Sequence, residues 1–154
     1  MLPSIEVRGR DELHRRFREF PKKYTAAVAK TMQASLLILQ GSAPKYPRPP
    51  AGSTYRRTGT LGRSLGISMS GGKVEKPDLF VVRKGGGYQE ARFGTRLHYA
   101  PYVVGDASSQ QAGHMKHWWT VPQTLLRAAR PKIDRAFEKL AEALAAYLDR
   151  NKQP

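Results

Sequence analysis

The sequence contains no cysteine, which excludes a disulfide framework and every form of thiol chemistry. Long apolar runs are also missing. Runs such as Leu36–Leu39 are far shorter than the roughly 20 residues that cross a bilayer. The first residues, MLPSIEVRGRDELHRRF, lack the apolar centre of a signal peptide. We therefore expect a protein made in the cytosol that has no membrane partner.

Acidic residues are scarce, with 12 against 27 lysines and arginines. Catalysis by a pair of carboxylates is therefore not indicated. Ser64 and Ser68 have no histidine–aspartate partners nearby, so a serine nucleophile is not indicated. His114 and His117 are three residues apart, but a zinc site needs three or four ligands. We expect no enzyme, no cofactor and no metal; a zinc hydrolase built on these two histidines is a remote alternative.

What the sequence has in excess is positive charge. The net charge is +15 over 154 residues, a length that suits one domain with a modest core. Such an excess is self-repelling unless a polyanion or an acidic surface is nearby. On charge alone, nucleic acid is the first candidate partner, an acidic protein the second and an anionic membrane the third, although we expect no membrane partner.

Residues 10–41 have the apolar spacing of a long helix. Apolar side chains recur every three or four residues from Leu13 to Leu39, which places them on one face. Pro21 either kinks this helix or starts a second one, because proline lacks the amide proton that the helix interior uses. Gly41 is a natural end.

Residues 42–60 form an extended loop that is rich in proline and arginine and contains no acidic residue. The forked N–H donors of an arginine guanidinium bind phosphates and carboxylates well. We expect the basic side chains in and just after this loop to line a DNA channel or contact an acidic partner. They are Lys45, Arg48, Arg56, Arg57 and Arg63.

The rest of the chain predicts a sheet followed by a second long helix. Residues 61–104 suggest three or four antiparallel strands. They include Leu61–Ser70 and, from Arg92 to Val104, either one long strand or two with a bend at Pro101. Residues 105–121 are a polar loop, and residues 122–150 carry an apolar helical stripe. The predicted fold is one α+β domain, 1–154, with a small antiparallel sheet flanked by two long helices.

Two strings in this chain resemble the signature of tailed-phage neck and tail-completion proteins. The first runs YPRPP, then STYRRTGTLGRSL, over residues 46–65. The second is YAPYVVG at 99–105, followed by a Gln pair, His114 and Trp118-Trp119-Thr120. The resemblance covers about residues 10–148 and identifies the chain as similar to this family of siphophage-type minor tail components.

The resemblance implies a structural role. Such proteins form rings, commonly sixfold, at the head–tail junction or the top of the tail tube, where they contact tube and connector proteins and leave a channel for DNA. It implies a location in the virion after assembly in the host cytoplasm. The subunit contacts would then come from six aromatic residues, Tyr46, Tyr55, Tyr99, Tyr102, Trp118 and Trp119. The alternative is a small basic nucleic-acid-binding protein.

Overall fold

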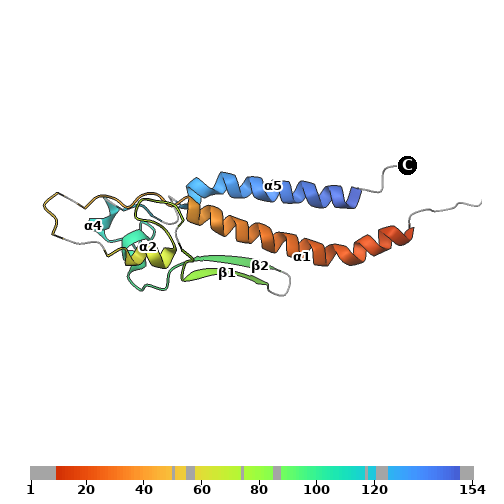
Figure 1. The fold of residues 1–154 in the computed structure, drawn as a ribbon, viewed down its shortest axis with the longest axis horizontal. Helices are drawn as coiled ribbons and strands as arrows, with labels where there is room; N and C mark the ends of the chain where they lie inside the picture. Colours follow the sequence, from red (N-terminus) through yellow and green to blue (C-terminus); the bar gives the residue numbers. More distant parts are fainter. Residues whose placement is uncertain are drawn as a thin grey trace, which may run out of the picture.

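The computed structural model describes residues 10–49, 51–54, 58–73, 75–84, 88–116, 118–120 and 125–149. Within them the first element is helix α1, Arg10–Gly41, so the predicted bounds of the first long helix are confirmed. The helix continues through Pro21, and the Thr25 hydroxyl donates to the Pro21 carbonyl at 2.7 Å. Figure 1 shows α1 bending towards its N-terminal end, as an internal proline favours.

The second long helix is α5, Arg127–Asp149, a few residues shorter than the predicted 122–150. Leu125 and Leu126 form a wider helical turn just before it. Pro131 lies inside α5, near its start. The half-buried side chains recur at helical spacing, with Ile133, Phe137 and Leu140 among them, so the predicted apolar stripe is confirmed.

The sheet is smaller than predicted. The described residues contain one antiparallel sheet of two strands, β1 (Leu79–Lys84) and β2 (Gln89–Gly94). The register pairs Leu79 with Gly94 and Lys84 with Gln89. The prediction of three or four strands was therefore wrong for this part of the chain, although the α+β class with two long helices and an antiparallel sheet is confirmed.

Part of the first predicted strand, Leu61–Ser70, forms a short helix instead: α2, Thr60–Leu65. Gly59 and Gly66 bracket it with φ of 72° and 63°, a left-handed conformation that glycine adopts without strain. Leu61 and Leu65 are four residues apart and both are buried, which suits a helix as well as a loosely alternating strand. Beyond α2 only a single bridge remains, between Ile67 and Lys73.

The second missing strand is also helical. Residues 100–104 form α3, Ala100–Val104, and Pro101 occupies its first turn, where a missing amide proton costs no hydrogen bond. A further short helix, α4 (Ala112–Met115), follows. Only the first part of the predicted strand, up to Gly94, belongs to the sheet.

The long elements form a layered stem with α1 in the middle. Figure 1 shows α5 along one side of α1 and the β1–β2 hairpin along the other. Lys23 Nζ donates to the Tyr147 hydroxyl at 3.0 Å, joining α1 to α5. Gln89 Nε2 donates to the Thr25 carbonyl at 3.0 Å, joining β2 to α1. We call α1, α5 and the hairpin the stem.

The hydrophobic core lies at one end of the stem, in a lobe made of the described residues between 42 and 78 and between 95 and 120. The lobe contains α2, α3 and α4 and lies to the left in Figure 1. The buried apolar cluster is almost confined to it: Ala43, Leu61, Leu65, Ile67, Ala100, Val104 and Leu125. The stem buries much less. Among the described side chains of α1 only Ser35, Leu36 and Gln40 are buried, and in α5 only Ala129 is.

One fully buried amide joins the stem to the lobe. Gln40, near the end of α1, donates through Nε2 to the Gly66 carbonyl at 2.6 Å and also to the Glu75 carbonyl. A Cβ on Gly66 would collide with the Glu75 carbonyl oxygen and with Gln40 Nε2. The close approach therefore depends on glycine at this position for space as well as for φ.

We predict that Gly66→Ala lowers the free energy of unfolding by about 2 kcal/mol more than Gly72→Ala. Gly72 is the matched control because its φ is 75° but a Cβ there would meet nothing within 4 Å, so it isolates the cost of the left-handed conformation, roughly 1–2 kcal/mol. Urea unfolding of both variants measures the difference. Equal losses would show that the contact with Gln40 and Glu75 is not tight.

Candidate functional site

The two sequence strings meet in the lobe. Residues from both line one small cavity of about 70 Å³: Tyr46, Thr58, Gly59, Thr60 and Leu61 from the first, and Tyr99, Val103, His114 and Trp118 from the second. This is space for one or two small groups. The strings that are separated in the sequence are therefore parts of one surface.

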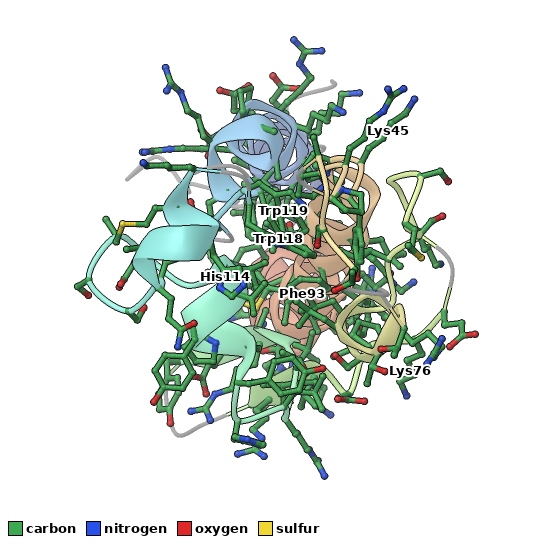
Figure 2. All side chains as sticks on the ribbon, turned by 90° about the vertical axis from the view of Figure 1, so that its left-hand side faces the viewer. Lys45, Lys76, Phe93, His114, Trp118 and Trp119 are labelled. Atoms are coloured by element: carbon green, nitrogen blue, oxygen red, sulfur yellow. The ribbon has the colours of Figure 1, made fainter. Side chains whose placement is uncertain are left out.

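Aromatic contacts build the wall of this cavity. The Tyr46 and Trp118 rings meet edge to face with centroids 5.1 Å apart. The His114 ring lies nearly perpendicular to Trp118 at 6.5 Å. Edge-to-face pairs of this kind add to the stability given by burial. Figure 2, which looks at the lobe, shows His114, Trp118 and Trp119 near the centre of the molecule.

Four of the aromatic residues predicted at subunit contacts pack within the chain. Tyr46, Tyr99, Trp118 and Trp119 are partly buried against the core cluster of the lobe. Tyr102 differs, because its side chain is 51% exposed on α3. Tyr55 lies outside the described residues. Of the aromatic residues predicted at subunit contacts and described here, Tyr102 is thus the one best placed to meet a neighbour.

Sequence reasoning missed Met115, which is 48% exposed on the neighbouring α4. The Tyr102 carbonyl holds the two helices together, since it accepts the Gln111 amide at 3.0 Å and contacts His114 Nδ1 at 2.9 Å. An exposed tyrosine and an exposed methionine therefore stand on adjoining helices. Because Tyr102 and Met115 are separated in the sequence, the sequence alone did not indicate that they lie on adjoining helices.

The basic residues of the predicted channel are placed in different ways. Lys45 and Arg48 are exposed, and neither forms an ion pair with any residue that the structure describes. Figure 2 shows Lys45 projecting outward on the side of the molecule where α5 lies. Arg56 and Arg57 lie outside the described residues. The exposed pair keeps its charge available for a partner.

Arg63 is exposed but is engaged with its own loop. Its guanidinium donates to the Thr58 carbonyl at 3.1 Å and to the Thr60 hydroxyl at 3.4 Å. Its backbone amide donates to the Gly59 carbonyl. Arg63 therefore braces the turn that opens α2, a structural task that the sequence alone did not reveal.

A second ordered loop follows α3. Asp106 Oδ1 accepts hydrogen bonds from the backbone amides and hydroxyls of Ser108 and Ser109, at 2.6–3.0 Å. The bond from the Ser108 hydroxyl, followed by those from Ser109, lowers the pKa of Asp106 to about 2. The turn places Gln110, which is buried and donates to the Val103 carbonyl at 2.7 Å.

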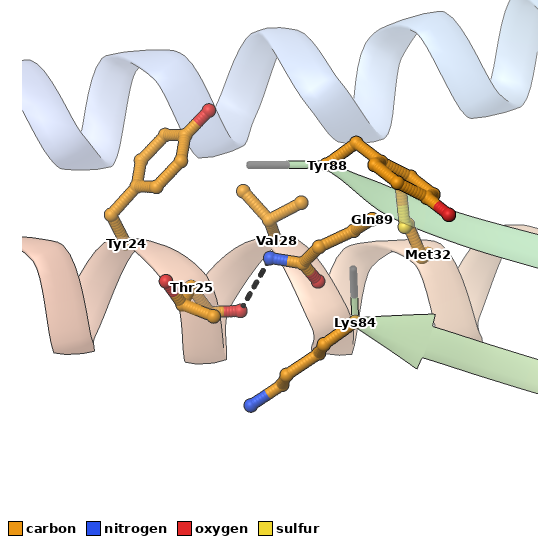
Figure 3. Close-up of a pocket in the computed structure, with 7 residues that line it drawn as sticks. All are labelled: Tyr24, Thr25, Val28, Met32, Lys84, Tyr88 and Gln89. Carbon is orange, nitrogen blue, oxygen red and sulfur yellow. Dashed lines mark hydrogen bonds between the residues drawn. The ribbon is translucent and has the colours of Figure 1, made fainter. Parts of the chain in front are cut away.

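A larger hollow of about 420 Å³ lies on the stem. Figure 3 shows its wall of Tyr24, Val28 and Met32 from α1, with Tyr88 just before β2, Gln89 at the start of β2 and Lys84 at the end of β1. The dashed line is the bond from Gln89 to the Thr25 carbonyl. The lining mixes aliphatic and aromatic side chains with the polar groups of Thr25, Lys84 and Gln89.

Metal and membrane sites gain no support from the described parts of the chain. They hold no group of three or more histidine, cysteine, aspartate or glutamate side chains that could bind a metal ion, and His117 lies outside them. None of the helices described here is long and apolar enough to cross a membrane.

Comparison of the chain with protein-family models, with curated protein sequences and with solved structures gave no match.

We predict a pH-dependent contribution of Asp106 to stability. Its pKa is lower in the folded state than the value of about 3.9 in an unfolded chain. The ionised carboxylate therefore stabilises the fold above about pH 4, and this contribution is lost as the pH falls towards 2. Urea unfolding should show Asp106→Asn less stable than the wild type at pH 7, with the gap closing by pH 2. A gap that stays constant down to pH 2 would contradict the assignment.

Proposed function

We propose that the chain is a structural subunit of a tailed phage, a tail-completion or head–tail joining protein that assembles into a ring. The observation that carries the proposal is the meeting of the two strings in one lobe. Described residues of both strings line one cavity, and Tyr102 and Met115 are exposed on the adjoining helices α3 and α4.

The stem supports an assembled state. Helix α1 has 32 residues and is about 48 Å long at 1.5 Å per residue. Its described side chains are mostly half-buried or exposed, so one chain covers little of this length. Neighbours in a ring would cover more of it, and a head-to-tail interface that closes into a ring uses two different faces of each subunit.

In this proposal the function is geometric. The ring, commonly sixfold, ends the tail tube, offers a face to the connector proteins of the head and leaves a channel for DNA. Lys45 and Arg48, exposed and without an ion pair among the described residues, face the channel or an acidic neighbour. Subunits assemble in the host cytoplasm and end in the virion.

The proposal is tested by locating the chain in virions of the phage that encodes it. We expect density for it at the neck or at the head-proximal end of the tail. We also expect particles made without it to accumulate as separate heads and tails. Density elsewhere, or joined particles in its absence, would overturn the proposal.

A nucleic-acid-binding protein is the second candidate, favoured by the net charge of +15. It predicts tight binding of free DNA by the isolated chain, with an affinity that falls steeply with salt in proportion to the phosphates neutralised. The ring subunit predicts weak binding that is independent of sequence. A salt series with one duplex separates the two candidates.

We predict that Tyr102→Ala combined with Met115→Ala weakens subunit association by about 30-fold or more, because truncating an interface hot spot costs about 2 kcal/mol. The control pair is Tyr88→Ala with Met69→Ala, which removes a tyrosine and a methionine elsewhere that are at least as exposed, at 66% and 48%. Sedimentation velocity, with tail tubes added if free subunits remain monomeric, measures association. Equal losses in both pairs would remove Tyr102 and Met115 from the interface.

A further inference from the structure

The hairpin of the stem has an open edge. Strand β1 pairs with β2 on one side, and the described residues place no strand on its other side. An open edge presents unpaired backbone N–H and C=O groups and is a template for another extended chain. At six residues, β1 offers about 20 Å of edge.

Two hollows follow this side of the hairpin, between α1 and β1. They have volumes of about 310 and 460 Å³, share Gln33 and Phe80, and are lined by β1 but by no residue of β2. The apolar part of their wall includes Phe80 and Val82 of β1 and Leu37 of α1, which is 41% exposed. The open edge therefore borders a partly apolar trough.

The trough is strongly basic at its rim. Four lysines and one acid, Glu75, line the two hollows, and all five side chains are exposed. None of the lysines has an ion pair among the residues that the structure describes. They come from α1, from the link before the hairpin and from β1, and are Lys30, Lys73, Lys76 and Lys84. Segments distant in sequence thus converge into one cationic rim.

We propose that an extended acidic segment of another protein binds along this edge as a third strand. Backbone hydrogen bonds to β1 would give affinity, apolar side chains would enter the trough, and carboxylates would meet the lysines. Pairing with the same edge of a second copy fits poorly, because that edge carries the same four lysines and like charges across an edge oppose pairing. The apolar wall favours a peptide over a nucleic-acid backbone. This proposal holds whether or not the chain is a neck subunit.

The test uses calorimetry of the full chain with a synthetic decamer of alternating glutamate and valine. Three further probes isolate each component of the binding: the same decamer with alternate backbone amides N-methylated, a decamer of glutamate alone, and a ten-nucleotide single-stranded DNA. We expect the alternating decamer to bind at least tenfold more tightly than each of the others. Equal binding of the N-methylated peptide would exclude strand addition, and tighter binding of the DNA would assign the trough to nucleic acid.

Two charge-matched variants locate the site. One replaces the four rim lysines by Gln, and the control replaces Arg96, Lys116, Lys132 and Lys139, which are exposed and do not line the trough. Both lose four positive charges. We expect at least a tenfold loss of affinity in the first and less than threefold in the control, with thermal unfolding unchanged in both.

Two other outcomes would overturn the proposal. Equal losses in the two variants would mean that binding responds to net charge alone. An alternating peptide that fails to bind would leave the lysines with only the task of keeping an open edge from aggregating. The Leu37→Asn variant is a separate check: it should weaken the alternating peptide at least threefold and leave the all-glutamate peptide unchanged.

Discussion

The arrangement of stem and lobe depends on the buried amide of Gln40. It comes from the last turn of the longest helix and donates to two carbonyls of the lobe, those of Gly66 and Glu75. Burying an amide costs free energy unless its donors are satisfied. Separating the stem from the lobe would leave both carbonyls without this donor. The orientation of α1 relative to the lobe core is therefore fixed by hydrogen bonds as well as by packing.

The two long helices were predictable because a spacing of three and four residues, repeated over many turns, has one structural reading. The short elements were not. Leu61 and Leu65 fit either a strand or a turn of helix. The chain forms a helix here, bracketed by two glycines in the left-handed conformation, Gly59 and Gly66. Pro101 was taken as a bend in a strand, yet it begins a helix. Local choices of this kind depend on backbone conformation that the residue types alone leave open.

The candidate site was predictable in its members more than in their roles. The two strings were singled out from the sequence and their described parts do come together. Most of their described aromatic side chains, however, pack against the core of the lobe. Arg63 was expected to reach a partner, and its contacts with Thr58 and Thr60 give it a task in its own loop. The lysine rim of the trough could not be read from sequence, because its members are brought together only by the packing of β1 on α1.

Both tryptophans of the chain are in the lobe, packed against its core. Intrinsic fluorescence of this protein therefore reports on the lobe, whereas the far-ultraviolet circular dichroism is dominated by α1 and α5. With the buried apolar side chains gathered at one end, the two signals follow different parts of one molecule. Their coincidence or separation during denaturation tells whether the stem keeps its structure only while the lobe is folded.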